Sequence, residues 1–383
     1  MKKIFIIALL LSFAFTAPAM AATETAEYQI LTTTMGGMQG MQMPLTMELD
    51  ARGTPVTGGA QEATHFIPAG MKMGNELPLL RPEQQGGGKD AGGVPGVQEN
   101  WTVKIYWGSS KTVQKGQPIV ISPQDMKSGK GKFAELANVG TGVRRSAPPS
   151  GWGWGKWPNK KSSIQVPKGA SLKGSHRLEG NYLPQIKFDV SNHDFLPPLN
   201  VKMGGDLKSS IPLSWGSVKG AVGYFAYAMA SNQAKKETII WTSSTKPTMG
   251  MMMHEHSSKI KELVKSGIVM GPDKSACDIP AGIFAECDGA MVMASAWGED
   301  YWVSHPPKPN NAPKNWKPDW TVNALFMSQW SGVPGMPDMP DMESIMREYG
   351  NQDENEKENE KGSSGGKKKS PGIGIPGIPG LKF

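Results

Sequence analysis

Apolar and polar side chains alternate over short segments of this chain, which is the pattern of half-buried β-strands. Residues 27–34 are rich in β-branched and aromatic side chains, and residues 45–49 alternate apolar with polar side chains. The methionine- and glycine-rich residues 35–44 lie between them. Together these segments predict a hairpin with a long loop.

Similar short segments recur along the rest of the chain and are separated by glycine and proline. Strands are expected at residues 101–107, 118–122, 185–190, 211–215, 220–229, 238–242, 290–297 and 320–327. One helix is expected among them, with Ser258 as its N-cap and Gly267 at its end. Its apolar face comprises Ile260, Leu263, Val264 and Ile268.

The spacing of these strands predicts an all-β fold with two β-sandwich-like domains, at residues 100–200 and 201–330. Residues 22–99 are expected to form a Met/Gly-rich region that contains the hairpin and a linker. Residues 331–383 mix charged residues with Gly, Ser and Pro, and they hold too little apolar surface to offset the entropy of folding. We therefore expect a disordered tail.

The first 21 residues predict a cleavable secretory signal. Two lysines and an apolar run at residues 4–15 precede the small-x-small sequence Ala19-Met20-Ala21. No later segment is apolar for long enough to cross a bilayer, so no membrane span is expected in the mature chain. The expected location is the periplasm or the medium outside the cell.

The formal net charge of +7 is a mild excess that favours anionic partners. Nucleic acid is not an expected partner, because an exported protein rarely meets it. Cys277 and Cys287 are the only cysteines. In an oxidising compartment two nearby cysteines predict a disulfide, and metal ligation is the alternative.

The sequence lacks the enzyme motifs that short patterns reveal. It contains no Gly-x-Ser-x-Gly and no phosphate-binding Walker loop. After His254-Glu255, Ser258 stands where the zinc-binding helix of a metalloprotease needs its second histidine. A non-enzymatic function is therefore expected, and a hydrolase that acts on envelope polymers is kept as a third alternative.

Methionine is in excess and is clustered along the chain. One cluster combines it with histidine: Met249, Met251, Met252, Met253, His254 and His256. Thioether and imidazole groups suit copper, so this cluster is a candidate copper site of an exported protein. The structural alternative is that methionine fills irregular gaps in loops and contact surfaces. No other cofactor is expected.

Residues 136–178 contain basic and aromatic residues but neither Asp nor Glu. The candidate binding residues are Arg144, Arg145, Trp152, Trp154, Trp157, Lys160 and Lys161. Aromatic faces stack on sugar rings and cations hold acidic groups, which favours an anionic envelope polysaccharide. The alternative is that the tryptophans pack inside a sandwich and the lysines form a solvated face. The isolated histidines His65, His176, His193 and His305 are expected to be hydrogen-bonded structural residues.

Two patterns resemble strands B and C of fibronectin type III domains: Leu213-Ser-Trp215 and Val218-Lys-Gly-Ala-Val-Gly-Tyr-Phe-Ala-Tyr227. The resemblance covers residues 201–330. It implies that the tryptophan of strand B packs in the core beside the tyrosine of strand C. Residues 290–297 and 320–327 would then be strands F and G, and the helix would be an insertion.

Other segments are similar to a family of uncharacterised exported proteobacterial proteins. They are His65–Gly74, Leu77–Leu80, Tyr106–Gly108, Gly116–Pro118 and Gly174–Tyr182. This resemblance implies export and implies no activity, and Ser109 stands where many of those proteins have Cys after Trp-Gly. The leading expectation is an exported, non-enzymatic binding or structural module of the cell envelope, with copper binding as the alternative. Its expected partner is an anionic polysaccharide or another envelope protein.

Overall fold

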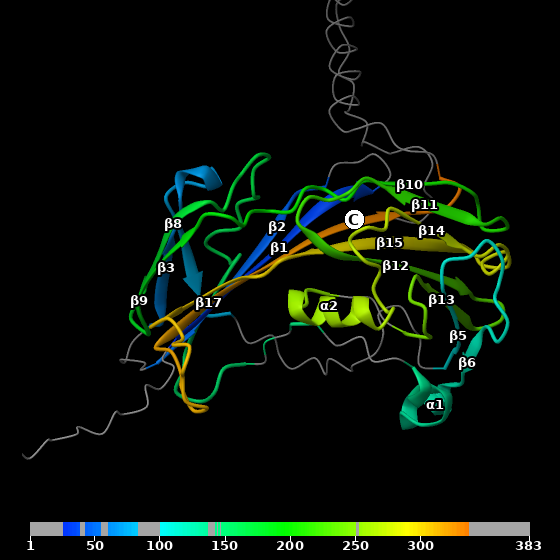
Figure 1. The fold of residues 1–383 in the computed structure, drawn as a ribbon, viewed down its shortest axis with the longest axis horizontal. Helices are drawn as coiled ribbons and strands as arrows, with labels where there is room; N and C mark the ends of the chain where they lie inside the picture. Colours follow the sequence, from blue (N-terminus) through cyan, green and yellow to red (C-terminus); the bar gives the residue numbers. More distant parts are fainter. Residues whose placement is uncertain are drawn as a thin grey trace, which may run out of the picture. The chain divides into compact units, whose positions relative to one another are not determined.

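The computed structural model of the 383-residue chain describes residues 26–38, 43–54, 60–82, 100–136, 142, 143, 145, 147–249 and 253–336. Most of their regular structure is β-strand, so the predicted all-β class is confirmed (Figure 1). The predicted signal at residues 1–21 lies outside the described residues, as does the predicted tail from residue 337 onward.

The larger sheet contains β1 (Ala26–Met38), β2 (Thr46–Gly53), β3 (Glu62–Phe66), β4 (Glu76–Leu80), β5 (Thr102–Trp107), β6 (Ile119–Ile121), β7 (Gly153–Trp157), β8 (Gly174–Gly180), β9 (Leu183–Val190), β12 (Ala221–Asn232), β13 (Glu237–Thr242), β15 (Gly289–Gly298), β16 (Tyr301–His305) and β17 (Trp320–Gly332). A smaller sheet contains β10 (Val201–Met203), β11 (Ile211–Trp215) and β14 (Ala276–Ile279). The helices are α1 (Pro123–Ser128), α2 (Ser257–Lys265) and the short 3-10 helices η1 (Ala69–Met71) and η2 (Gly131–Glu135). None of these described helices is long and apolar enough to cross a bilayer.

The order of the described strands in the larger sheet is β6-β5-β13-β12-β15-β17-β1-β2-β7-β4-β3-β8-β9, and β16 pairs with β17. The predicted hairpin is confirmed, because β1 pairs antiparallel with β2. β1 also pairs parallel with β17, and β5 pairs parallel with β13. One sheet therefore crosses the boundaries that the sequence predicted near residues 100 and 200, because its strands come from all three predicted regions.

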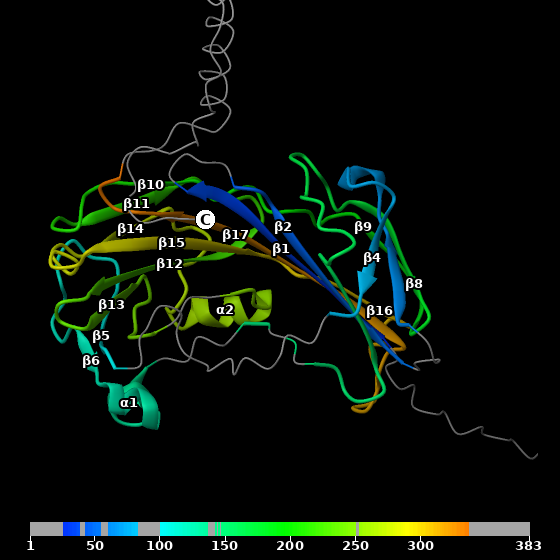
Figure 2. The ribbon, with the colours of Figure 1, turned by 180° about the vertical axis from the view of Figure 1, so that it is seen from behind.

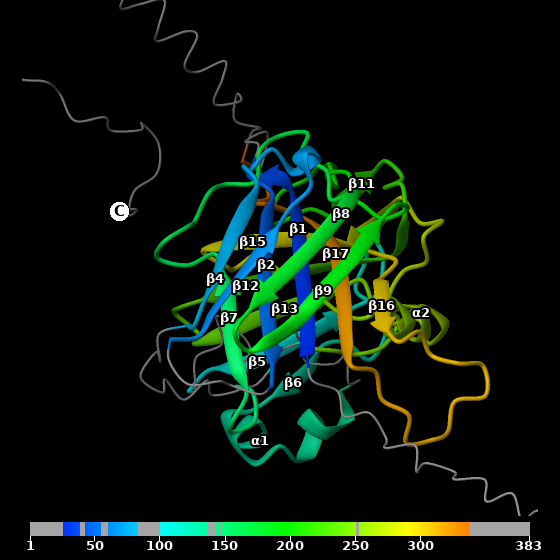
Figure 3. The same cartoon turned by 90° about the vertical axis from the view of Figure 1, so that its left-hand side faces the viewer.

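The smaller sheet and α2 lie on opposite sides of the larger sheet (Figures 1 and 2). The described residues form an apolar core on each side. The smaller sheet covers one face of β12 and β15 in a sandwich-like arrangement, and the ring centroids of Trp215 and Tyr224 lie 5.5 Å apart there. β9 folds over the same face of β1 (Figure 3), where Phe188 lies 6.3 Å from Tyr28. α2 covers the opposite face and buries Ile260 there.

A strand alternates buried and exposed side chains only where these layers cover one of its faces and leave the other in water. Residues 320–328 of β17 are all buried, because both faces of this central strand are covered. β9 instead alternates buried with exposed positions along much of its length, because one of its faces meets water. β17 also extends to Gly332, which is two residues into the segment predicted as tail.

α2 begins one residue before the predicted N-cap, and a distant carboxylate caps it. His256 is the N-cap residue, and Asp300 Oδ1 accepts a hydrogen bond from the backbone N–H of Ser257 at 2.9 Å. Ser258 is therefore inside the helix and the prediction that it caps the helix is wrong. The predicted end is confirmed, because Gly267 has φ 75° and follows the last turn.

Cys277 and Cys287 are free thiols in the structure, so the predicted disulfide is wrong. Cys277 lies on β14 opposite Leu213, with its side chain buried in the core between the sheets. Cys287 follows a turn in which its N–H donates to Phe284 O, and its thiol lies near Tyr106 of β5. Burial raises the pKa of Cys277 to about 12 and that of Cys287 to about 11, so both thiols stay protonated at neutral pH.

Candidate functional site

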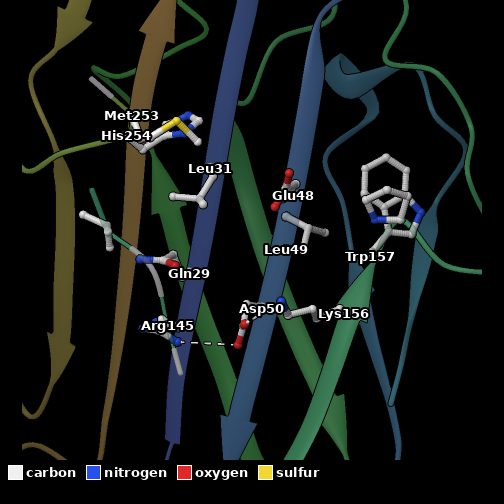
Figure 4. Close-up of a pocket in the computed structure, with 12 residues that line it drawn as sticks. Gln29, Leu31, Glu48, Leu49, Asp50, Arg145, Lys156, Trp157, Met253 and His254 are labelled. Carbon is white, nitrogen blue, oxygen red and sulfur yellow. Dashed lines mark ion pairs between the residues drawn. The ribbon is translucent and has the colours of Figure 1, made fainter. Parts of the chain in front are cut away.

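A cavity of about 460 Å³ lies over one face of β1, β2 and β7 (Figure 4). We call it the β1–β2–β7 cavity, and we call the face beneath it the outer face of these strands. The lining residues are Gln29, Leu31, Glu48, Leu49, Asp50, Val143, Arg145, Lys156, Trp157, Pro158, Met253 and His254. The cavity thus combines three strands with the segment that precedes β7, at Val143 and Arg145, and a distant segment at Met253 and His254.

Strand pairing places a polar row across the floor of the cavity. Gln29 on β1 lies opposite Asp50 on β2, and Asp50 lies opposite Lys156 on β7. Directly opposed residues of antiparallel strands point to the same face of a sheet. The register therefore brings these three side chains together, while their neighbours along each strand point toward the core.

Asp50 is at the centre of a charge cluster. Arg52 donates two hydrogen bonds to it, with Nε 2.7 Å from Oδ1 and Nη2 3.0 Å from Oδ2. Lys156 Nζ lies 3.6 Å from Oδ2, and Arg145 Nη1 lies 3.8 Å from Oδ1. Arg145 also pairs with Glu27 at 3.3 Å. The side chains of Asp50 and Arg52 are only 11% and 7% exposed, so removal of one charge would leave the other poorly solvated.

Trp154 lies on the outer face beside this cluster. It is paired with Arg52 across β2 and β7. The Arg52 guanidinium carbon lies 5.4 Å from a Trp154 ring centroid, and Lys156 Nζ lies 5.1 Å from it. Cations at these distances are attracted to the π-face of the indole. Trp154 therefore positions two cations of the cluster.

Two of the glycines of residues 151–155, Gly153 and Gly155, are explained by the inner face of β7, which points toward the core. A Cβ atom on Gly153 would overlap the ring of Tyr182, and one on Gly155 would overlap its hydroxyl group. Tyr182 is 1% exposed and packs directly on the backbone of β7. These two glycines make room for the ring, and Trp154 between them points away from the core.

The predicted glycan-binding residues are found in different surroundings. Arg145 and Trp157 line the cavity, but Trp157 is only 2% exposed and its Nε1–H donates to Ser162 Oγ at 2.9 Å. Trp157 is therefore mainly a core residue. The others are Trp152 and Trp154, which are partly buried, Lys160 and Lys161, which are exposed beyond β7, and Arg144, which lies outside the described residues.

The predicted copper residues are also divided. Met253 and His254 line the cavity, whereas Met249 packs against the core under α2. His256 Nδ1 lies 2.8 Å from Asp300 Oδ2 at the start of α2. The remaining two, Met251 and Met252, lie outside the described residues. In the part of the chain that the structure describes, no three His, Cys, Asp or Glu side chains are grouped so that they could hold a metal ion.

The inner face of β1 carries a buried chain of hydrogen bonds. Tyr28 Oη lies 2.8 Å from His65 Nδ1, and His65 Nε2 lies 3.0 Å from His176 Nδ1. His176 Nε2 donates to Leu172 O at 2.7 Å. Because a carbonyl only accepts, neutral imidazoles require that His65 donates to His176 and that Tyr28 donates to His65. This confirms the prediction that His65 and His176 are hydrogen-bonded structural residues.

The surroundings of this chain favour the neutral forms. Burial lowers the pKa of His65 well below its ordinary value, and the neighbouring His176 adds to this effect. Burial also lowers the pKa of His176 and raises that of Tyr28 well above the ordinary value. The other two isolated histidines, His193 and His305, stack on Phe326 and Trp320 of β17.

Sequence reasoning missed the centre of the charge cluster. Residues 48–52 read Glu-Leu-Asp-Ala-Arg, so charged and apolar side chains alternate there. This pattern indicates a strand with one charged face, but the strand was expected to end at residue 49. Asp50 and Arg52 were therefore not considered as a pair.

No protein-family model matches this chain. No curated protein matches it either.

Proposed function

We propose that this protein is an exported, non-enzymatic binding module of the cell envelope whose β1–β2–β7 cavity holds an acidic oligosaccharide. The observation that supports this most directly is the position of Lys156. It lines the cavity 3.6 Å from Asp50 Oδ2, which is too far for a hydrogen bond, while Arg52 already donates to both oxygens of that carboxylate. The N–H groups of Lys156 can therefore turn toward the carboxylate of a ligand.

The other lining groups suit a sugar. The carboxamide of Gln29 and the carboxylate of Glu48 can bind hydroxyl groups, and Leu31 offers an apolar contact between them. A volume of about 460 Å³ is within the range of pockets that bind small ligands, roughly 300–1,000 Å³. Because these residues project from paired strands, the pocket is built before the ligand arrives.

Exposed lysines near the cavity favour an acidic ligand. The charges at the cavity itself are nearly balanced, so it should not bind every polyanion. Lys160 and Lys161 are exposed just beyond Pro158, which itself lines the cavity. The cations of the cavity are balanced by Glu48 and Asp50, which line it, and by Glu27, which pairs with Arg145. We therefore expect recognition of a single carboxylate at short range, and only a moderate dependence on salt.

Calorimetric titration with an oligogalacturonate and with a neutral galactose oligosaccharide tests the proposal. We expect binding of the acidic oligosaccharide, and a loss of about tenfold in affinity for Lys156→Ala, because a charge-assisted hydrogen bond is removed. Lys187→Ala, which removes an exposed lysine of β9, is the matched control and should bind like the wild type. Equal binding of the neutral oligosaccharide, or an unchanged affinity in Lys156→Ala, would contradict the proposal.

Two further measurements address the other parts of the proposal. Chromatography of the oligosaccharide after incubation should show an unchanged chain length, whereas shorter products would favour the hydrolase alternative. Export is supported by the sequence of residues 1–21. Fractionation of cells that express the full chain should give a protein that begins at Ala22 outside the cytoplasm.

A further inference from the structure

We propose that Met253 Sδ and His254 Nδ1 bind one Cu(I) ion at the edge of the β1–β2–β7 cavity. Both residues line the cavity, and Figure 4 shows their sulfur and imidazole atoms at the end opposite to Trp157. This site goes beyond the oligosaccharide proposal and does not depend on it. It also differs from the copper cluster expected from the sequence, because it uses only two members of that cluster.

The hydrogen bonds of His254 determine which nitrogen can bind a metal. Nε2 lies 3.0 Å from Thr32 O and 3.3 Å from Thr33 Oγ1. Because the carbonyl of Thr32 only accepts, Nε2 must carry the proton, and the lone pair of the neutral ring is on Nδ1. Among the described residues, no hydrogen-bond partner is placed on Nδ1.

This arrangement is typical of a metal-binding histidine. A ligating imidazole usually donates its other N–H to a backbone carbonyl or a carboxylate, which orients the ring. The hydrogen bond from Nε2 to Thr32 O plays this part here and leaves Nδ1 as the ligating atom. Glu48 lines the same cavity and would balance the charge of a bound cation.

Met253 supplies the second metal-ligating atom and makes the site accessible from solvent. Met253 is 40% exposed, whereas its neighbour His254 is only partly exposed. A soft thioether with one imidazole suits Cu(I), whereas zinc and magnesium prefer other sets of ligands. The donor set therefore favours Cu(I).

The backbone of these two residues is held on both sides. The indole N–H of Trp297 donates to Met253 O at 3.0 Å, and the N–H of Val143 donates to His254 O at 2.7 Å. Trp297 is itself 1% exposed in the core beneath α2. The two donors are thus presented from a fixed backbone, which reduces the entropy lost when a metal binds.

Neighbouring candidates do not share this geometry. His256 Nδ1 faces Asp300, and Met249 packs in the core under α2. Met291 is 45% exposed on β15 and does not line the cavity. His256→Gln and Met291→Leu are therefore matched controls for the two proposed ligands.

An anaerobic competition titration of the mature protein with Cu(I) and a chromophoric Cu(I) chelator tests this site. We expect a dissociation constant below about 1 µM for the wild type. Met253→Leu and His254→Gln should each weaken binding by about tenfold or more. Met253 is exposed, so its leucine variant should fold. The two control variants should bind like the wild type.

X-ray absorption spectroscopy of the Cu(I) protein should show both a nitrogen and a sulfur ligand, and the sulfur contribution should be lost in Met253→Leu. Wild-type binding weaker than about 1 µM, or unchanged affinity in both ligand variants, would overturn the site even if other groups of the chain take up copper. Lys156→Ala separates the two proposals, because it should weaken oligosaccharide binding and leave Cu(I) affinity unchanged.

Discussion

The two faces of β1, β2 and β7 accommodate buried polar groups in opposite ways. On the inner face, the neutral groups of Tyr28, His65 and His176 satisfy one another in a closed chain of hydrogen bonds. On the outer face, Asp50 and Arg52 form an ion pair beside a cavity. The inner face is sealed by apolar layers and cannot solvate a charge, whereas the outer face is close to water. Alternate residues of β1 and β2 thus face either the sealed core or the edge of the cavity.

The largest effect is expected when the ion pair of the outer face is broken. Asp50→Asn keeps the size of the side chain but leaves Arg52 without its counter-charge in a site that is 7% exposed. We expect a loss of about 3 kcal/mol in the free energy of unfolding, measured by urea denaturation. Asp273→Asn, which alters an exposed pair with Lys274, should change it by less than about 0.5 kcal/mol. If both variants changed the free energy of unfolding by similarly small amounts, the charges of the cluster would not depend on one another as a buried ion pair does.

A slightly smaller effect is expected from the inner face of β7. Gly153→Ala forces a methyl group into the ring of Tyr182, and either the ring or the strand must shift. Overpacking of this kind costs about 2 kcal/mol, which denaturant unfolding can measure. In Gly289→Ala the new Cβ atom meets nothing within 4 Å, so this control should be neutral or slightly stabilising. Equal stabilities of the two variants would refute the packing role of the repeated glycines.

Loss of a hydrogen bond from the buried chain of the inner face should lower the free energy of unfolding more than loss of a similar bond at the surface. Tyr28→Phe leaves His65 Nδ1 buried without its donor, and we expect a loss of about 1.5 kcal/mol in the free energy of unfolding. Tyr301→Phe removes a bond to Asp189 O at the surface and should cost about 0.5 kcal/mol. If Tyr301→Phe lowered the free energy of unfolding more than Tyr28→Phe, the buried hydrogen bonds would not be a significant source of stability.

The buried histidines of this hydrogen-bond chain predict how the free energy of unfolding depends on pH. Burial lowers the pKa of His65 and His176 in the folded protein, while both titrate near the ordinary value of about 6.5 in the unfolded chain. Below about pH 6.5 the unfolded chain therefore binds protons that the folded protein refuses. The free energy of unfolding should fall as the pH falls from there toward the lowered pKa values.

His176→Phe tests this dependence, because its ring can keep the stack on Phe188 while one titrating group is removed. Urea denaturation between pH 7.5 and pH 5 should show a shallower slope in this variant, by at most about 1.4 kcal/mol per pH unit. His305→Gln, at an exposed position of β16, should keep the slope of the wild type. A slope that is the same in all three proteins would contradict the role of the buried imidazoles.

Local patterns were sufficient to predict part of this architecture. The alternation of residues 45–49 and the β-branched residues before it predicted the hairpin of β1 and β2. The helical spacing near Ile260 predicted α2, although its capping carboxylate comes from Asp300. The resemblance to fibronectin type III domains stays a prediction, and the contact of Trp215 with Tyr224 agrees with what it implies.

The candidate site was less accessible to such patterns. The tryptophans of residues 152–157 predicted a binding surface, but Gly153 and Gly155 beside them are explained by packing against Tyr182, which is distant in the sequence. The two cysteines are near each other in sequence and nevertheless lie in different surroundings as free thiols. Nearness along the chain does not fix the direction of a side chain, which depends on the strand and the layer that it joins.

The sequence by itself determined the all-β class, the hairpin and the helix, because these depend on the period with which apolar side chains recur. Only the tertiary structure decided that His65 would meet His176 and that Asp50 would lie among Arg52, Arg145 and Lys156. The contacts between strands depend on strand order and on antiparallel pairing between segments that are distant in the sequence. The period of apolar side chains along a strand contains no information about which strands become neighbours in a sheet. The β1–β2–β7 cavity depends on that strand order.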